Sequence, residues 1–291
     1  MNTWDNQYLN LMQDILDNGI EVPCRTGDIV RKKLNCQLNY DLDNGFPLLT
    51  FRPLPFKGCR VELSGFLQGI TDKKWYQDNG CKYWDSWCNP EKVPYSDKEG
   101  MKQERDLGSI YGFEWRHFDA EYINYDTDYT GKGFDQLQAV VDKLKTDPYD
   151  RRMIISAWNP NNNKNKALPP CLYLYQFTYL GGRLHINAKM RSTDLVLGCP
   201  TDFAGTALLL MLVAQTIGMK PGTVCLDMTD CHIYENHIPV IQENLENWRK
   251  NQFELPQLVL DPAATVFNFT WDMAKLENYQ HGEKISFDVA I

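Results

Sequence analysis

The spacing of apolar residues along the chain predicts several helices. Residues 4–18 place apolar side chains three or four positions apart, the period of a helix with one buried face, and Gly19 follows as a stop. Residues 59–69 and 133–146 show the same period and are predicted as helices. The longest apolar run, residues 204–217, falls short of the roughly 20 residues that a bilayer span requires. It therefore predicts a helix buried in a protein core.

Other segments carry the alternating, β-branched and aromatic pattern of strands. Five are predicted as strands: residues 36–40, 153–158, 172–179, 183–190 and 223–228. A tight turn at Gly181 and Gly182 joins two of them as a hairpin. With helices between and around the strands, the pattern predicts a single α/β (α+β) domain over residues 1–291, with a mixed β-sheet flanked by helices. Residues 161–166 are predicted as an exposed loop, and residues 89–105 as a surface insertion.

Composition narrows the class of protein. A chain of 291 residues with 43% hydrophobic residues can bury a full core, and its net charge of −8 argues against a surface that coats nucleic acid. Free nucleotides are not excluded. Nine cysteines without a CxxC pair predict reduced thiols, and five histidines without tight spacing predict no metal site. The first residues lack a basic stretch before an apolar one, so we expect no secretion signal and a cytoplasmic location.

The segment KMRSTDLVLGCPTDFA (189–204) concentrates chemically active residues. A guanidinium fork beside a short hydroxyl, Arg191 and Ser192, suits one phosphate or other oxyanion. Asp202 follows the turn at Gly198 and Pro200 and opens the apolar run. An acid at that point either caps the helix or reads a ligand, and this pattern by itself leaves both interpretations open.

Cys171 lies in the segment LPPCLY at the start of a predicted strand. A cysteine in a strand is usually a small buried hydrophobe, but positive charge nearby would stabilise its thiolate and make it a nucleophile. The predicted hairpin brings Arg191, just past the next strand, back towards this residue. Cys171 is therefore a candidate nucleophile with Arg191 as the activating cation.

Arginines recur at the boundaries of predicted elements: Arg25, Arg151, Arg152 and Arg191. Each alone suits a solvated surface charge, whereas the four together suit a dianionic phosphate. His232 and Tyr234, two residues apart in DCHIYENH, share one face of a strand-like segment. They suit either a sugar hydroxyl or a satisfied pair in the core.

These pieces coincide with a family. The chain resembles the thymidylate synthases and their relatives, the pyrimidine-nucleotide hydroxymethylases, across nearly its whole length. The matching stretches are RTG (25–27), NGFPLLT (44–50), ELSGFLQG (62–69), YWDSW (83–87), DLGSIYGFEWR (106–116), DPYDRRMIISAWNP (147–160), LPPC (168–171), RSTDLVLGCP (191–200), DCHIYENH (230–237) and VAI (289–291). So many stretches in the same order make a specific signal.

The resemblance implies a homodimer in which the sheets of two subunits pack face to face. It implies that Arg25, Arg191 and Ser192 hold the nucleotide phosphate, with Arg151 and Arg152 donated across the interface. His232 and Tyr234 would take the deoxyribose hydroxyl. In the reaction that the family carries out, Cys171 would add to C6 of the pyrimidine, while Glu62 and Tyr111 would manage protons.

The resemblance also implies a co-substrate, 5,10-methylenetetrahydrofolate, and no metal. The residues that would contact the folate are Arg52, Trp84, Asp194, Gly198 and Ala290. The last of these belongs to a C-terminal segment, residues 289–291, that would close over the bound ligands and exclude water. Arg52 replaces the lysine usual in the family and keeps its charge, and Gly65 replaces a usual tryptophan.

Two departures from the synthases fall where the pyrimidine would be recognised. Asp202 replaces an asparagine that reads uracil; an aspartate can accept from the 4-amino group of cytosine and share a proton with N3. Leu172 replaces a histidine that follows the cysteine, and the deoxycytidylate hydroxymethylases show both changes. The sequence therefore favours dCMP over dUMP, and dCMP suggests a virus, such as a bacteriophage, that marks its DNA in the host cytoplasm.

The fate of the transferred carbon is a separate question. Thr201 replaces a usual phenylalanine and could admit water, which favours 5-hydroxymethylation. The retained residues 289–291 favour the alternative, reductive methylation of dUMP or dCMP. A third interpretation is an inactive homodimer that binds nucleotide or RNA.

Overall fold

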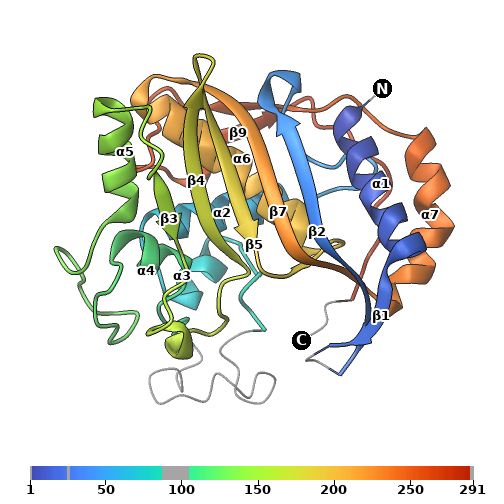
Figure 1. The fold of residues 1–291 in the computed structure, drawn as a ribbon, viewed down its shortest axis with the longest axis horizontal. Coiled ribbons are helices and arrows are strands. Elements are labelled where there is room, and N and C mark those ends of the chain that lie inside the picture. Colours follow the sequence, from blue (N-terminus) through green and yellow to red (C-terminus); the bar gives the residue numbers. More distant parts are fainter. Residues whose placement is uncertain (1, 25–26, 87–104, 289–291) are drawn as a thin grey trace.

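The computed structural model describes residues 2–24, 27–86 and 105–288, which form a domain around one mixed, seven-stranded sheet (Figure 1). The strand order is β1-β2-β7-β5-β4-β3, with β6 beside β7. Strands β5 and β6 run parallel to β7, and the other neighbours are antiparallel. The bounds of these strands are β1 Ile20–Pro23, β2 Ile29–Asp41, β3 Ile154–Ser156, β4 Leu172–Leu180, β5 Arg183–Met190, β6 Thr193–Asp194 and β7 Lys220–Tyr234. A separate antiparallel pair consists of β8 Gln257–Leu260 and β9 Ala274–Glu277.

Seven α-helices occur in the described ranges: α1 Thr3–Asn18, α2 Phe56–Leu67, α3 Lys73–Asp78, α4 Tyr111–Arg116, α5 Gln136–Thr146, α6 Gly198–Ile217 and α7 Ile238–Lys250. The helices predicted at residues 4–18, 59–69 and 133–146 correspond to α1, α2 and α5, so the predicted single α/β domain with a mixed sheet is confirmed. The start of α5 was predicted three residues early. Asp135 accepts a hydrogen bond from the Gln138 amide and caps the helix there.

Helix α6 is the predicted core helix, and it lies behind the strands in Figure 1. By length and composition it could cross a membrane, and in the described ranges no other helix could. Most of its side chains are buried inside the domain, where it packs on β5 and β7. The apolar side chains of α6 therefore form part of the hydrophobic core of the domain.

The predicted strands at residues 36–40 and 223–228 lie within much longer strands, β2 and β7. Asn35 has a φ of 56° and is left out of the pairing of β2 with β7, but the register is the same at Leu34 and at Cys36. The first half of β2 contains the consecutive charged residues Arg31, Lys32 and Lys33. The alternation of apolar and polar residues is therefore visible in the sequence only in the second half of the strand.

The prediction of an exposed loop at residues 161–166 is wrong for its last residue. Lys166 is buried, and its ammonium lies 3.0 Å from a carboxylate oxygen of Glu114 in α4, also fully buried. The ammonium also donates to the side chain of Asn163 and to the carbonyl of Ala157. A buried partner 52 residues away in the sequence cannot be seen in a local pattern. The predicted insertion at 89–105, apart from Arg105, lies outside the described residues.

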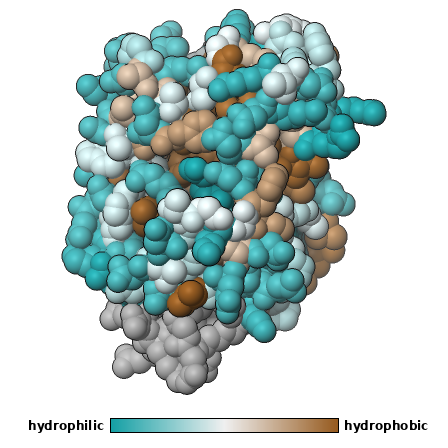
Figure 2. All heavy atoms as spheres, turned by 90° about the vertical axis from the view of Figure 1, so that its left-hand side faces the viewer, coloured by the Kyte–Doolittle hydropathy of each residue, from teal (hydrophilic) through white to brown (hydrophobic). Residues whose placement is uncertain are grey.

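One face of the sheet has no helix packed on it in the described chain (Figure 1). Its side chains are polar, and Lys189 of β5, Asp227 of β7 and Gln37 of β2 are joined by hydrogen bonds. Asn187 has a buried carbonyl oxygen on β5 without a hydrogen-bond partner among the described residues. The side that carries α5 is also mostly hydrophilic, with scattered hydrophobic residues (Figure 2), but it is not an uncovered sheet face with a buried, unsatisfied polar atom. The uncovered sheet face is thus the better candidate for an interface.

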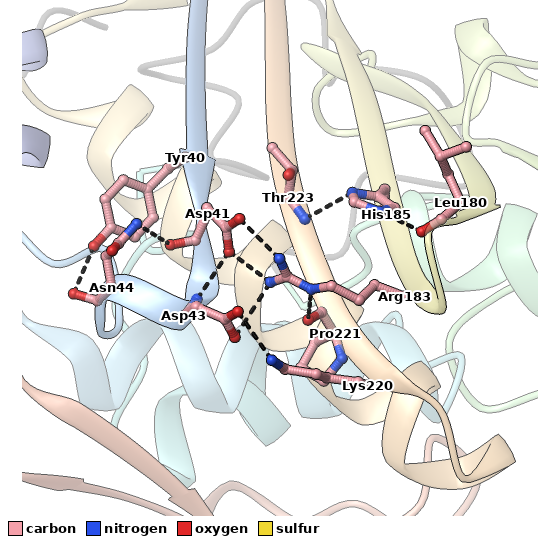
Figure 3. Close-up of polar contacts among 10 residues, drawn as sticks. All are labelled: Tyr40, Asp41, Asp43, Asn44, Leu180, Arg183, His185, Lys220, Pro221 and Thr223. Atoms are coloured by element: carbon pink, nitrogen blue, oxygen red, sulfur yellow. Dashed lines mark hydrogen bonds and ion pairs between the residues drawn. The ribbon is translucent and has the colours of Figure 1, made fainter.

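At one end of the sheet the charged side chains find partners within the chain (Figure 3). Arg183, at the start of β5, forms two hydrogen bonds with Asp41 at the end of β2 and lies 3.3 Å from Asp43. Lys220, at the start of β7, also pairs with Asp43. This end of the sheet is closed by a self-contained ion-pair network.

Candidate active site

The opposite end of the same strands opens into a pocket of about 1220 Å³. It lies where β4 begins and where β5 and β7 end, so residues from distant parts of the chain converge there. Residues proposed from the sequence that line it are Arg52, Glu62, Cys171, Arg191, Ser192, Asp194, Gly198, Asp202, His232 and Tyr234. The structure therefore brings most of the predicted site residues to one place.

Cys171 immediately precedes β4 and is half-buried at the pocket wall. The predicted hairpin forms, and it places the Arg191 Nη2 atom 3.5 Å from the Cys171 Sγ atom. The Arg191 amide also donates to the Cys171 carbonyl over 2.9 Å, which holds the two segments together. A guanidinium at this distance stabilises a thiolate.

The other contacts of Arg191 leave its charge uncompensated. Its side chain donates to the carbonyl oxygens of Pro169 and Pro170, each at 2.9 Å. Among the described residues, no carboxylate forms an ion pair with it. A guanidinium that faces a pocket without an anionic partner is suited to a bound oxyanion, and Ser192 lies beside it.

Tyr111 and Trp84 lie behind the pocket wall and orient residues that reach it. The Tyr111 hydroxyl accepts a hydrogen bond from the Cys171 amide over 2.9 Å, and its ring stacks on Phe66. The Trp84 indole N–H donates to a carboxylate oxygen of Glu62 over 2.9 Å. In this structure both aromatic residues act on the pocket through a neighbour.

Glu62 projects from α2 into the pocket with a strongly perturbed carboxyl group. Burial, and to a smaller extent the charge of Asp202, raise the pKa of Glu62 to about 8, although the Trp84 hydrogen bond opposes this. A carboxyl group that holds its proton near neutral pH can deliver or accept it during a reaction.

Asp202 is not a helix cap. Helix α6 begins at Gly198, its N-cap residue is Leu197, and no side chain caps it. Asp202 therefore lies in the second turn of the helix, with its side chain at the pocket. Burial raises the pKa of Asp202 to about 7. Of the two interpretations left open by the sequence, the structure excludes capping and retains ligand recognition.

His232 and Tyr234 lie on β7, with ring centroids 5.3 Å apart, and both line the pocket. His232 donates through Nδ1 to Asp230 over 2.9 Å, which leaves Nε2 available as an acceptor. Lys32 of β2 pairs with the same carboxylate at 2.6 Å. Asp230 and Lys32 were not singled out in the sequence, although Asp230 begins the DCHIYENH stretch.

A second group of predicted residues lines the pocket wall around the start of α6. Arg52 is buried, donates to the Val196 carbonyl, and lies 5.4 Å from the centroid of the Phe287 ring. Asp194 accepts a hydrogen bond from the Val196 amide over 2.8 Å, and burial raises its pKa. Gly198 opens α6. The segment that ends at Phe287 therefore returns to this wall.

The structure explains one substitution whose effect the sequence left open. A Cβ atom on Gly65 would lie 2.4–2.5 Å from the ring of Tyr76. Tyr76 thus fills the space that a larger side chain at position 65 would need, and its hydroxyl donates to the Ile70 carbonyl. An aromatic ring, that of Tyr76, is therefore buried beside position 65 although residue 65 itself is a glycine.

Besides Tyr111 and Trp84, two described residues that were predicted for the site do not line the pocket. Arg151 and Arg152 are exposed, and the Arg152 side chain is paired with Asp150. They do not line the pocket of their own chain. Arg25 and Ala290 lie outside the described residues. Across the ranges 2–24, 27–86 and 105–288, no group of three His, Cys, Asp or Glu residues is arranged to hold a metal ion.

Comparison with known proteins agrees with this geometry. The family model described as thymidylate synthase matches residues 6–291. The chain is 40% identical over 288 residues, 98% of its length, to a bifunctional dihydrofolate reductase-thymidylate synthase of Zea mays, and similarly to one of Oryza sativa subsp. japonica. It spans only about half the length of these relatives (54% and 57%). It is also 37% identical over 288 residues to a thymidylate synthase of Homo sapiens, covering 90% of that protein.

Proposed function

Because the chain belongs to the thymidylate synthase family, we propose that it transfers a one-carbon unit from 5,10-methylenetetrahydrofolate to C5 of a pyrimidine deoxynucleotide. The observation that carries this proposal is the contact of 3.5 Å between the Cys171 thiol and Arg191, in a pocket where Arg191 has no carboxylate partner among the described residues. The Arg191 guanidinium can thus both stabilise the Cys171 thiolate and bind an anion.

In the proposed reaction, Arg191 and Ser192 bind the phosphate of the nucleotide and Arg191 favours the thiolate of Cys171. The thiolate forms a bond to C6 of the pyrimidine, which makes C5 nucleophilic towards the methylene carbon carried by the folate. The C5 proton then leaves, with Glu62 positioned to manage protons, and the bond between the methylene carbon and the folate nitrogen breaks to release tetrahydrofolate. Addition of water to the methylene carbon and expulsion of the Cys171 thiolate from C6 would complete 5-hydroxymethylation. His232 and Tyr234 are proposed to bind the sugar hydroxyl, and Arg52, Trp84, Asp194 and Gly198 to serve the folate.

We propose cytosine as the preferred base. Asp202 faces the pocket, and its carboxyl group titrates near neutral pH. One proton shared between this group and N3 of cytosine lets the second oxygen accept from the 4-amino group, which pairs both N3 and the amino group. Ionised Asp202 would instead face O4 of uracil, an acceptor against an anion, which disfavours that base.

The second candidate is thymidylate formation from dUMP. The names of the relatives in maize, rice and humans support it more directly than they support a cytosine-modifying reaction. A protonated Asp202 can present an O–H to O4 and a carbonyl oxygen to N3–H, much as an amide would. The two candidates therefore differ in the protonation of one carboxyl group.

For the product, we propose the 5-hydroxymethyl group. Thr201 lines the pocket beside Asp202, and its small polar side chain can admit water to the methylene carbon. Reductive methylation is the alternative product. It would require hydride, instead of water, to reach the methylene carbon, and therefore a drier site.

A homodimer is proposed in which the uncovered sheet faces pack together. The polar face with the buried, unsatisfied Asn187 oxygen supports this, as does the outward position of Arg151 and Arg152 on their own chain. Each subunit would place these two arginines at the phosphate of its partner.

Tritium release from [5-³H]dCMP and [5-³H]dUMP, each with 5,10-methylenetetrahydrofolate, tests the proposed function. Release from dCMP at a higher kcat/KM than from dUMP is the expected result, and the product mass distinguishes hydroxymethyl from methyl. Preferential release from dUMP would establish the second candidate. The absence of release from either nucleotide would leave the inactive nucleotide- or RNA-binding homodimer as the better interpretation.

Subunit mixing tests the shared site. Cys171→Ser and Arg152→Glu variants should each be inactive as purified. After joint unfolding and refolding, heterodimers should regain activity, because one of their two sites contains both native residues. A mixture that stays inactive while sedimenting as a dimer would contradict the donation of Arg152.

A further inference from the structure

A small second cavity of about 30 Å³ lies directly behind the residues that would recognise the base. It shares Glu62, Thr201 and Asp202 with the main pocket and continues between α2, α6 and β4. About 10–15 Å³ is enough to hold a water molecule when polar partners are present. The cavity is therefore large enough for one ordered water.

Besides the carboxyl groups of Glu62 and Asp202, the polar side chains at the cavity include Tyr175 of β4, which carries a hydroxyl group. Tyr175 is only 3% exposed, yet its hydroxyl makes no hydrogen bond within the part of the chain that the structure describes. A hydroxyl that borders a cavity and has no protein partner is suited to bond an ordered water.

Asp202 supplies the second unpartnered group on the cavity wall. Its carboxyl group accepts no hydrogen bond from any described residue, and burial is the cause of its raised pKa. The Thr206 hydroxyl is not available as its donor, because it donates 2.7 Å back to the Asp202 backbone carbonyl. A donor and an acceptor thus face the same small space without satisfying each other directly.

The cavity exists because of a small residue in the helix. Gly205 of α6 lines it, and a Cβ atom built there would lie 3.6 Å from the Cys59 sulfur, an ordinary van der Waals contact. An alanine would fit without displacing any neighbour. The glycine therefore leaves space that the packing of α6 does not itself require.

We propose that this cavity is a site for one water molecule, which accepts a hydrogen bond from Tyr175 and donates one to Asp202. By stabilising the ionised or proton-sharing form of Asp202, the Tyr175–water pair biases recognition towards cytosine. Tyr175 is in this sense a specificity-determining residue that acts through the water and Asp202. The role in base choice rests on the proposed function, whereas the effect on the Asp202 carboxyl group does not.

Two variants should remove the water site, each by a different change. Tyr175→Phe deletes the donor, and Gly205→Ala occupies the space with a methyl group while improving helix propensity. In both variants we expect the kcat/KM for dCMP to fall about tenfold, as for one lost water-mediated hydrogen bond, and that for dUMP to fall less. Gly205→Ala should nevertheless raise the melting temperature, so lost activity cannot be assigned to unfolding. Tyr40→Phe is the control, since its hydroxyl bonds the Asn44 carbonyl at the far end of the sheet.

A measurement independent of activity completes the test. The titration of the Asp202 carboxyl carbon, followed by ¹³C NMR and assigned with Asp202→Asn, should give a higher pKa in Tyr175→Phe and in Gly205→Ala than in the native protein. An unchanged pKa in both variants would overturn the water site, even if the nucleotide reaction proceeds as proposed. If the native protein releases no tritium from either nucleotide while the pKa shifts as expected, the proposed function fails and the water site stands.

Discussion

Two arginines, eight residues apart on either side of β5, show how the two ends of one sheet differ. Arg183 opens the strand and is held by Asp41 and Asp43, so its charge is neutralised inside the chain (Figure 3). Arg191 follows the strand and contacts only carbonyl oxygens and the Cys171 thiol among the described residues. The difference teaches that partner identity, more than residue type, separates a structural arginine from a ligand-binding one.

The aspartates at the two ends of the sheet show the same contrast as the arginines: Asp41 has partners within the chain, and Asp202 has none among the described residues. Hydrogen bonds from Arg183 hold the pKa of Asp41 below its usual range, whereas burial raises that of Asp202 to about 7. Asp41 is thus compensated in the folded chain, and Asp202 bears a cost that a ligand can relieve. Carboxyl groups whose charged form is disfavoured by burial are concentrated at the pocket end, where Glu62 and Asp202 converge.

The largest expected effect is at Cys171. Cys171→Ser should lower C5 tritium exchange by about 10³-fold or more, because the serine hydroxyl is a far weaker nucleophile than a thiolate. Tritium release under saturating nucleotide and folate measures it. Cys36→Ala, which removes a buried core thiol from β2, is the control and should retain exchange at a lower melting temperature. Persistent exchange in the serine variant would rule out the covalent step.

Replacing each of the two arginines by methionine tests the contrast between the pocket end of the sheet and the opposite end. Arg191→Met should raise the KM for nucleotide by about 10²–10³-fold, since charge-assisted hydrogen bonds to phosphate are lost. Arg183→Met should leave kcat/KM within about twofold and lower the free energy of unfolding by about 1 kcal/mol, as for a partly exposed ion pair. Kinetics and denaturant titration of both variants measure these effects. If both variants lost activity equally, the distinction between the two ends would be wrong.

Asp202→Asn tests the choice of base. An amide can accept from N3–H and donate to O4 of uracil, so the ratio of kcat/KM for dCMP to that for dUMP should fall about 10²-fold. The measurement is parallel tritium release from the two nucleotides. Asp128→Asn changes an aspartate outside the pocket lining, whose carboxylate accepts a hydrogen bond from the Thr130 amide, and should leave the ratio unaltered. A ratio that stays constant in Asp202→Asn would remove the role given to this carboxyl group.

The two acids should also give opposite pH dependences of stability. Because the folded-state pKa of Asp202 is raised, its contribution is full below about pH 4 and is lost as pH rises to about 7. Asp202→Asn should therefore be more stable than the native protein at pH 8, by on the order of 1–2 kcal/mol. At pH 5 this difference in the free energy of unfolding should be smaller. Urea titrations at both pH values measure the difference. A pH-independent difference would show that burial of the charge is not the cause.

The smallest effect is expected at Asp41, whose lowered pKa reverses the sign. Its contribution is present above the unfolded-state pKa and is lost as pH falls. Asp41→Asn should lower the melting temperature slightly at pH 7, differ progressively less from the native protein as pH falls below the usual aspartate pKa of about 4, and leave activity unchanged. Thermal melts across this pH range provide the check.

Several helices and the main catalytic candidates could be predicted because their evidence is local. The apolar period marks α1, α2 and the core of α6, and the two glycines between β4 and β5 mark the hairpin that joins Cys171 to Arg191. The first half of β2 was missed because the consecutive charged residues 31–33 hide the alternation in the sequence. Lys166 was assigned to an exposed loop because its partner, Glu114, is distant in the sequence.

The sequence by itself determined the family, the mixed α/β domain and the residue types available for chemistry, since period, turn residues and motif order are properties of neighbouring positions. Only the tertiary structure decided that Asp202 lies past the start of α6 and does not cap it, and that Tyr175 and Asp202 border one cavity. Burial and the presence or absence of a partner set the pKa and availability of a group. Both depend on segments that meet only when the chain folds.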